Sequence, residues 1–364
     1  MAAKLKINLL NLKHNLDRIK EKLYLNQELL VMVKADAYGA GLIEVTKFLE
    51  EQGVTNFGVA YLDEAILLRN QGIKGKIIVF SGLLPNEVEK AVNIDAVYSV
   101  SSIEMLEEMN NKSNGKKIKV ELAIDTGMTR LGFDVEDMEL LAAKLNTLKN
   151  IEIDGIYTHF SSADNDSKEN VTLEQIKAFE QCVVSLENAG VHIKNKHMCN
   201  SAGILRYNSD KYNIVRLGIS AYGYYADKSM KNEIELKPIF KLVAPVCNLR
   251  TVGAGKSVSY NGTYITDRET KIAVLQIGYA DGLTRTLSNK LKVKINGQEA
   301  PVIGNICMDT CMIDVTNADV CIGDEAVIFD YENEKLEEIA RLTNTIHYEV
   351  ITNIGKRVDR EYIK

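Results

Sequence analysis

The sequence predicts an α/β protein, a (β/α)8 TIM-type barrel followed by a mainly β C-terminal domain. Short apolar runs alternate with helix-like segments over roughly the first 220 residues, and this alternation stops near residue 235. Strict alternation implies parallel strands joined by crossover helices. Eight such units fit a closed barrel better than an open sheet.

The predicted barrel strands are apolar along their length, which is typical of strands covered on both faces. They span 28–33, 56–60, 76–80, 95–100, 117–124, 153–158, 196–200 and 213–218. In the second of the intervening helices, Asp63 is a plausible N-cap and Gly72 a plausible stop. The predicted helices span 41–52, 63–72, 86–94, 102–110, 135–145, 172–190 and 201–205.

The domain boundary is predicted in the polar stretch 226–238. Residues 1–234 are assigned to the barrel, with packing of the first ten or so against the β domain as the alternative. Residues 235–364 are assigned to the β domain, where helical patterns nearly vanish. Its predicted strands span 239–252, 270–280, 289–297, 300–315 and 323–330, followed by a helix over 334–344.

Composition excludes several classes of protein. Of the 364 residues, 46% are hydrophobic and 26% charged, and the net charge of −6 with scattered Lys and Arg argues against a nucleic-acid surface. The six cysteines form no C-x-x-C and no zinc spacing, so we expect reduced thiols and no metal site. The N-terminus lacks an apolar targeting segment, and no window approaches about 18 apolar residues. We therefore expect a cytoplasmic protein with no membrane partner.

Polar side chains follow several of the predicted strands where each strand ends. Lys34 follows the first strand, and Tyr38 and a flexible, glycine-containing loop come next. The carboxyl ends of barrel strands meet at one rim, where function is carried. Each residue alone has an ordinary interpretation as a solvated lysine, an ion-pair arginine or a helix cap. Their coincidence at one rim favours a site formed by Lys34, Tyr38, Asp125, Arg130, His159, Asn200, Ser201 and Arg216.

The chemistry of these groups points to a phosphorylated aldehyde. Lysine forms a Schiff base with a carbonyl, best when burial or nearby cations lower its pKa. The segments 200–205 and 216–223 offer small residues and backbone N–H groups that open short helices, and such N-termini bind phosphate. Pyridoxal 5'-phosphate is the cofactor that combines both features.

The sequence resembles the alanine racemases over nearly the whole chain. The stretch VMVKADAYGAG, residues 31–41, is similar to the cofactor-lysine motif of that family. The glycine-containing segments are weak alone but specific together and in this order. They are DTGMTRLG (125–132), THFSSAD (158–164), NSAG (200–203), VRLGISAYG (215–223), SVSYNGTY (257–264), IGYADG (277–282), GNICMDTCMID (304–314) and YEVITNIGKRV (348–358).

The resemblance implies a pyridoxal-phosphate-dependent isomerase that interconverts L-alanine and D-alanine for cell-wall peptidoglycan. Lys34 would carry the cofactor and act as one base. Tyr260 would be the opposing base, supplied by the other subunit of a head-to-tail homodimer. Two bases on opposite faces suit a reaction that removes a proton from one face and returns one to the other. Tyr264 lies four residues further on, but the motif assigns the role to Tyr260.

The same resemblance assigns further residues. Arg216 would face the pyridine nitrogen, with His159 beside it. Cofactor contacts, mainly around the phosphate, would come from Tyr38, Asn200, Ser201, Gly218, Ile219 and Tyr348. Arg130 and the backbone N–H of Met308 would hold the substrate carboxylate. The remaining supporting roles would fall to Tyr279 and Tyr348 at the entrance, Asp309 in the interior and Cys307 as a pocket-lining thiol.

One position departs from the family pattern. Alanine racemases often carry a carbamylated lysine two residues before the Asp of the DTGM motif, and this chain has Ala123 there. Arg130 would then lack its usual anionic partner. Our hypothesis is that an anion such as chloride, or a water cluster, takes that place.

Three alternatives to an alanine racemase are considered. A serine or broad-specificity racemase differs only in the substrate pocket. Tyr348 and Met308 would keep this pocket small, and a small pocket favours alanine as the substrate. A non-catalytic pyridoxal-phosphate-binding barrel would lack the β domain and its tyrosine. A decarboxylase of the same plan typically has an acidic residue where Arg216 stands.

Overall fold

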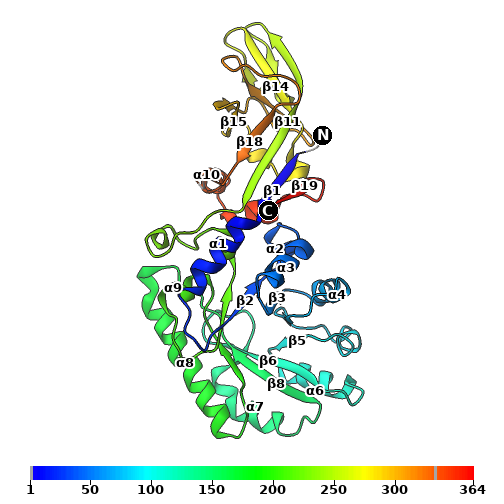
Figure 1. Ribbon diagram of the computed structural model, residues 1–364, viewed down its shortest axis with the longest axis vertical. Helices are drawn as coiled ribbons and strands as arrows, with labels where there is room; N and C mark the ends of the chain where they lie inside the picture. Colours follow the sequence, from blue (N-terminus) through cyan, green and yellow to red (C-terminus); the bar gives the residue numbers. More distant parts are fainter. Residues whose placement is uncertain (1–2, 332–333) are drawn as a thin grey trace. The chain divides into compact units, whose positions relative to one another are not determined.

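The computed structural model describes residues 3–331 and 334–364, which form two compact units (Figure 1). The barrel unit contains Lys13–Ala37 and Leu42–Leu236. The β unit contains the residues up to Leu12, the short segment Tyr38–Gly41, and Lys237–Lys364. The chain therefore enters the β unit three times.

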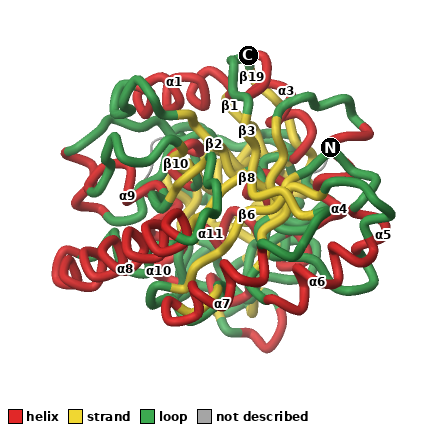
Figure 2. The backbone as a smooth tube through the Cα atoms, turned by 90° about the horizontal axis from the view of Figure 1, so that it is seen from below, coloured by secondary structure: helices red, strands yellow, loops and turns green. Residues whose placement is uncertain are grey.

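The barrel unit is built on eight parallel strands in the order β10-β2-β3-β4-β5-β6-β8-β9. Between β10 and the end of β9, the Arg216 N–H donates to the Cys199 carbonyl at 3.0 Å. Figure 2 shows the strands at the centre with helices around them. All eight predicted strands are confirmed, as β2 Glu28–Met32, β3 Asn56–Val59, β4 Lys76–Val79, β5 Val97–Val100, β6 Ile118–Asp125, β8 Ile151–Tyr157, β9 Asn195–His197 and β10 Ile214–Leu217.

Helices follow the strands as the alternation predicts. They are α3 Leu42–Glu51, α4 Leu62–Asn70, α5 Val88–Ala91, α6 Ile103–Lys112, α7 Met138–Leu145, α8 Glu169–Asn188 and α9 Ser201–Arg206, and α1 Leu9–Lys20 precedes β2. The predicted N-cap at Asp63 is wrong, because α4 begins at Leu62 and its N-cap is Tyr61. There the Glu64 side chain accepts the Tyr61 N–H at 3.1 Å, which supplies the capping that Asp63 was expected to give.

The barrel core comes from the apolar runs that predicted the strands. Leu30, Val31, Phe57, Leu122 and Ile156 are all fully buried. Burial of each such side chain contributes about 1.5–3 kcal/mol to the stability of the folded barrel. The packed strands in turn hold the polar groups at their ends in place.

The β unit is organised around the long strand β11 Phe240–Val252. β11 pairs antiparallel with β1 Lys4–Asn8, β18 Glu325–Phe329 and β14 Thr270–Leu275. Residues 4–8 thus lie in this sheet, where β1 also pairs in parallel with β19 Asp359–Ile363. The other elements are β12 Ser257–Val258, β13 Tyr264–Ile265, β15 Lys292–Ile295, β16 Gln298–Pro301, β17 Cys311–Asp314, α10 Glu334–Leu342 and α11 His347–Thr352.

The mainly β character of this second part is confirmed. Across residues 3–331 and 334–364, no helix is both long and apolar enough to cross a membrane.

Candidate active site

Lys34 stands directly after the buried strand β2. The preceding residue, Val33, donates its N–H to the Gly58 carbonyl at 2.8 Å, so the barrel fixes the backbone where Lys34 begins. Burial lowers the pKa of Lys34, and the positive charges of Arg130 and Arg216 lower it further, against an opposing effect of Glu64. A larger neutral fraction makes this amine a better nucleophile toward a carbonyl.

The backbone after Lys34 is a left-handed turn rather than the flexible loop that the glycines suggested. Ala35, Asp36, Ala37 and Tyr38 all have φ between 52° and 56°. Residues with a Cβ lose about 1–2 kcal/mol each in this conformation. The Ala37 N–H donates to the Val33 carbonyl at 2.8 Å, which closes the turn.

Two carboxylates hold this strained turn. Glu64 accepts the Ala35 N–H at 2.8 Å, and Asp36 accepts the Leu42 N–H at 2.8 Å. Together these bonds offset part of the strain and fix the direction of the chain around Lys34.

Arg216 on β10 is almost fully buried, with 4% of its surface exposed. Its Nη2 donates to the Thr158 carbonyl at 2.7 Å and the Met198 carbonyl at 3.0 Å. Nη2 also lies 3.3 Å from Nδ1 of His159. Because Nη1 is bonded to His197, only Nε makes no hydrogen bond to any residue that the structure describes. Nε is therefore the donor that Arg216 can offer to a ligand.

His159 lies beside Arg216, as predicted from the motif. Burial lowers the pKa of His159 well below its usual value, and the charges of Arg216, Arg130 and Lys34 act in the same direction. The imidazole is therefore neutral at physiological pH.

A group of aromatic and ionisable side chains packs against Arg216 inside the barrel. The guanidinium lies 5.3 Å from the ring centroid of Tyr157, and that ring stacks on His197 at 5.2 Å. His197 in turn lies 2.9 Å from the Glu121 carboxylate. Burial raises the pKa of Tyr157 to about 12, against a hydrogen bond with Ser99, so the phenol stays protonated.

Arg130 is exposed and comes from a loop that Asp125 organises. The Asp125 carboxylate accepts four backbone N–H groups, those of residues 127 to 130, at 2.9–3.0 Å. Burial opposes ionisation of Asp125, but these four donors prevail and its pKa is lowered. The loop thus has a fixed shape, and the Arg130 side chain makes no hydrogen bond within the described parts of the chain.

Ala123, where the family motif often has a lysine, is 1% exposed on β6 and is the register partner of Tyr157. No ionisable side chain can be supplied from this position. The proposed anion or water cluster beside Arg130 remains a hypothesis.

The residues predicted to hold a phosphate gather at the start of α9 and the end of β10. Asn200 is the N-cap of α9 and accepts the Gly203 N–H at 3.0 Å. The Ser201 hydroxyl accepts the Gly218 N–H at 3.0 Å, which leaves its own proton for another acceptor. Ile219 opens the short helical turn that follows.

In the β unit, Tyr260 projects from a tight turn and is 69% exposed. The turn begins at Ser259, whose φ of 64° and ψ of −172° fall in a region that only glycine adopts freely. The Ser259 hydroxyl donates to the Asn305 carbonyl at 2.6 Å, and the Asn305 amide donates to the Tyr260 carbonyl at 2.7 Å. The backbone position of Tyr260 is therefore fixed while its ring is exposed.

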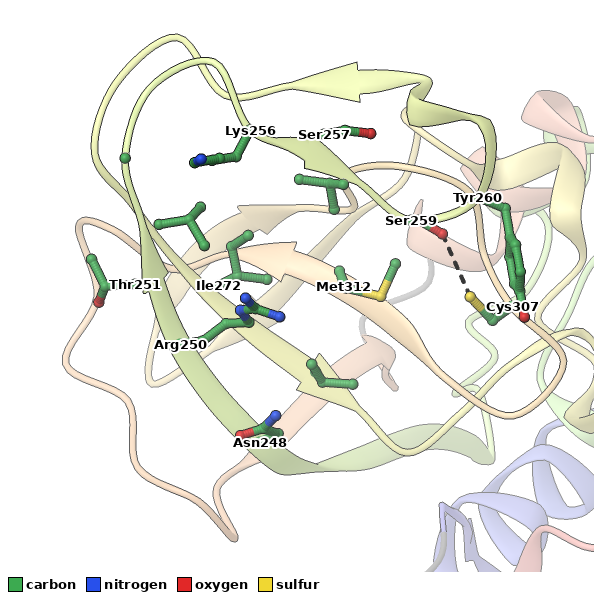
Figure 3. Close-up of a pocket in the computed structure, with 14 residues that line it drawn as sticks. Asn248, Arg250, Thr251, Lys256, Ser257, Ser259, Tyr260, Ile272, Cys307 and Met312 are labelled. Atoms are coloured by element: carbon green, nitrogen blue, oxygen red, sulfur yellow. Dashed lines mark hydrogen bonds between the residues drawn. The ribbon is translucent and has the colours of Figure 1, made fainter.

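Tyr260 lies at the edge of a pocket of about 830 Å³ (Figure 3). Cys307, also in its wall, has its sulfur 3.5 Å from the Ser259 hydroxyl. Two cations, Arg250 and Lys256, line the pocket as well, and none of the described residues in its lining is a carboxylate.

Met308 and Tyr279 occupy neighbouring turns in this unit. Tyr279 donates its N–H to the Cys307 carbonyl at 3.0 Å and is 43% exposed. Met308 is 52% exposed, and its N–H has no hydrogen-bond partner among the described residues, so it can serve an anionic ligand.

The remaining predicted residues also lie in the β unit. The rings of Tyr38 and Tyr348 are 6.3 Å apart. Asp309 does not lie in the interior of its unit: its side chain is 62% exposed and pairs with Arg357 at 2.8 Å. The other side of Arg357 binds Asp281 at 2.9 Å, so this arginine links two turns.

Five residues that support the site were not predicted from the sequence: Glu64, Glu121, Tyr157, His197 and Arg357. A signal was available for two of them, because Glu121 and His197 are ionisable residues inside predicted buried strands. In the described residues, no group of three or more His, Cys, Asp or Glu side chains could hold a metal ion.

Comparison with protein families gives two matches that together span nearly the whole chain. Residues 7–226 match the alanine racemase N-terminal domain, and residues 239–362 match the alanine racemase C-terminal domain. An alanine racemase of Clostridium kluyveri is 41% identical over 98% of this chain and 93% of its own length. One of Clostridium novyi is 39% identical over 98% of this chain and 94% of its own length.

Solved structures agree with these matches. An alanine racemase of Clostridium difficile superposes with a TM-score of 0.95 at 37% identity, covering 100% of this chain and 96% of its own. A complex of that enzyme with cycloserine gives a TM-score of 0.93 at 36% identity, with the same coverage. An alanine racemase of Bacillus anthracis with bound L-Ala-P gives 0.94 at 32% identity, covering 100% of this chain and 95% of its own.

Proposed function

Because the chain belongs to the alanine racemase family, we propose that this isomerase interconverts L-alanine and D-alanine with pyridoxal 5'-phosphate, using Lys34 and Tyr260 as opposing bases. The single observation that carries the proposal is the setting of Lys34. Its amine has a lowered pKa, stands at the end of a barrel strand, and is influenced by both Arg130 and Arg216. The family match and the active-site chemistry thus agree.

The residues present fit the proposed cofactor. When bound, pyridoxal 5'-phosphate supplies an aldehyde that condenses with an amine and a ring that withdraws electrons from the substrate α-carbon. Lys34 would hold it covalently, and Arg216 would donate to the ring nitrogen through Nε. The remaining contacts, mainly to the phosphate, would come from Tyr38, Asn200, Ser201, Gly218, Ile219 and Tyr348, with His159 beside the ring.

Arg216 would also limit the chemistry. A guanidinium keeps its protons in proteins, so it donates a hydrogen bond without giving a proton away. A ring nitrogen facing Arg216 would stay unprotonated and would withdraw electrons less strongly. This favours a simple proton exchange over transamination or decarboxylation.

Two proton carriers would act on the substrate. Lys34 would remove or return the α-proton on one face, and Tyr260 on the other. Arg130 and the unbonded N–H of Met308 would hold the carboxylate, so that the α-carbon presents its proton to one base at a time. Tyr279 and Tyr348 would narrow the entrance.

Tyr260 would come from a second copy of the chain in a homodimer. Its ring is 69% exposed in the single chain, although a hydrogen bond fixes its backbone. We expect this combination of a fixed backbone and an exposed side chain for a residue that contributes to the active site of another subunit. We further propose a cytosolic location, since all six cysteines are free, and supply of D-alanine to peptidoglycan.

The test is α-proton exchange in deuterated water, followed for both enantiomers of alanine and serine, with and without added pyridoxal 5'-phosphate. We expect cofactor-dependent exchange and racemisation of alanine, with serine slower. Absence of racemisation in protein that holds the cofactor would contradict the proposal, and faster turnover of serine would change the substrate.

A further inference from the structure

A fully buried carboxylate in the barrel has no role in the proposed mechanism. Glu121 on β6 is 0% exposed, and its Oε2 lies 2.9 Å from Nε2 of His197. Its other oxygen, Oε1, has no hydrogen-bond partner among the residues that the structure describes. A buried ionisable group of this kind is costly unless its charge is used.

The hydrogen bonds around His197 fix its tautomer. Nη1 of Arg216 lies 2.7 Å from Nδ1 of His197, and a guanidinium has donors but no acceptor. Nδ1 must therefore accept this bond and carry no proton. The ring proton is then on Nε2, where it is donated to Glu121.

The charge on Arg216 needs a counter-ion within the barrel. Apart from His197, its partners are backbone carbonyls and His159, which are all neutral. Two other cations, Lys34 and Arg130, act electrostatically on Arg216 or are acted on by it. Burial lowers the pKa of Arg216, and the negative charge of Glu121 is among the groups that oppose this.

The other buried carboxylate of the barrel unit is already engaged. Asp154 pairs with Lys76 at 2.8 Å and accepts the Asn195 amide at 3.0 Å. Glu121 is thus the buried carboxylate connected to Arg216, with the imidazole of His197 hydrogen-bonded to both side chains.

We propose that Glu121 is a positioning residue that fixes His197 as the Nε2–H tautomer and thereby keeps Arg216 oriented and positively charged. A buried carboxylate orients the catalytic histidine of serine proteases in the same manner. In this chain the contacts run from Glu121 through His197 to the guanidinium of Arg216, and we call these three residues the relay. The relay holds a hydrogen-bond donor in a fixed position. Only the expected effect on turnover rests on the proposed function.

The surroundings hold the relay in place. Tyr157 stacks on the His197 ring with an interplanar angle of 22°, and its hydroxyl is held by Ser99 at 2.6 Å. Gly155 leaves room for the carboxylate, because a Cβ there would lie 3.2 Å from Oε1 of Glu121.

The tautomer can be tested without turnover. In full-length protein with ¹⁵N-labelled histidine, with and without cofactor, the His197 signals would be assigned by their loss in His197→Gln. We expect a protonated Nε2 and an unprotonated Nδ1 from pH 6 to 8. A doubly protonated ring, or a proton on Nδ1, would overturn the proposal whether or not the protein racemises alanine.

Turnover tests the positioning role. In Glu121→Gln, an amide oxygen can still accept the Nε2 proton, but the charge is gone. We expect kcat to fall by about 10- to 100-fold, with KM for alanine changed far less, because Arg216 stays in place but loses the negative charge that balances its own. The matched control is Asp154→Asn, which removes the other buried carboxylate and should keep the wild-type kcat.

Unchanged kcat in folded Glu121→Gln, or an equal loss in Asp154→Asn, would contradict the positioning role. If Glu121→Gln does not fold, Glu121→Asp keeps the charge with a shorter side chain. It should retain the Nε2–H tautomer, and loss of that tautomer would count against the proposal. Failure of the wild-type protein to racemise alanine, with the expected tautomer present, would instead contradict the proposed function.

Discussion

The Glu64 carboxylate binds the N–H of Ala35 through Oε1, at 2.8 Å. Its second oxygen, Oε2, accepts the Ala60 N–H at 2.7 Å and the Tyr61 N–H at 3.1 Å, at the start of α4. One side chain therefore links the beginning of a helix to the strained turn that follows Lys34. The position of the lysine depends on that link.

Replacing Glu64 with Ala should loosen this turn. We expect a loss of about 1–3 kcal/mol in stability, because three backbone N–H groups lose their hydrogen bonds to a carboxylate. We also expect slower Schiff-base formation between Lys34 and pyridoxal 5'-phosphate. Thermal unfolding and the rate of cofactor absorbance change measure the two effects.

The matched control is Glu50→Ala. Glu50 also accepts two backbone N–H groups, those of Lys74 and Gly75, both at 2.8 Å. The Glu50→Ala variant should lose stability without slowing Schiff-base formation at Lys34. Equal slowing in both variants would show that Glu64 has no special link to the lysine.

The reactivity of Lys34 should reflect its lowered pKa. An amine attacks a carbonyl in its neutral form, so a lower pKa shifts the pH midpoint of the reaction below the ordinary lysine value of 10.5. Removing the nearby positive charge in Arg130→Met should raise that midpoint. The measurement is borohydride-trapped adduct against pH.

Lys34→Ala serves as the control and should form no adduct. A midpoint that stays fixed or falls in Arg130→Met would contradict the electrostatic effect of Arg130 on this amine.

Tyr260→Phe should impair proton exchange of one enantiomer only. Loss of a proton carrier costs about 10²- to 10⁴-fold on the face that it serves. Exchange on the face served by Lys34 should survive. Separate deuterium-exchange rates for L-alanine and D-alanine measure this asymmetry.

Tyr264→Phe provides the matched comparison, four residues away in the same segment, and should behave as wild type. Equal residual exchange of both enantiomers in Tyr260→Phe would remove its role as a base for one face.

Mixing two inactive variants should restore activity if the active site is shared between subunits. Lys34→Ala and Tyr260→Phe homodimers, allowed to exchange subunits, should yield heterodimers with one intact site each. About a quarter of wild-type activity is expected at full exchange, because half of the dimers are mixed and each has one of two sites. No recovery despite demonstrated exchange would argue for sites built within single chains.

His159 should remain neutral where an exposed histidine would be protonated. Its pKa is lowered well below 6.5 by burial and by the charges of Arg216, Arg130 and Lys34. Between that lowered value and 6.5, the unfolded chain binds a proton that the native chain does not, so stability falls as pH drops below 6.5. His159→Gln should reduce this loss by at most about 1.4 kcal/mol per pH unit.

The measurement is the pH dependence of thermal unfolding between pH 5 and 7.5. A protonated His159 at pH 6.5, seen by NMR, would contradict the expected neutrality.

The barrel could be predicted because its strands are buried on both faces and so are apolar throughout. The relay could not, since the strand pattern of 117–124 marks Glu121 only as an interruption and says nothing about His197, which lies 76 residues away. The left-handed turn was also missed, because Ala35 and Ala37 have no local preference for positive φ. It is held by distant groups such as Glu64, which a local pattern does not reveal.

The pairing of β1 with β19 has a consequence for synthesis. Residues 4–8 lie beside residues 359–363, so β1 leaves the ribosome long before the strand with which it pairs. At about 5–20 residues per second, synthesis of the chain between these two strands takes roughly 20 to 70 s. During that interval the nascent β1 has an open edge that chaperones can bind, and premature termination near the C-terminus would leave it permanently unpaired on that side.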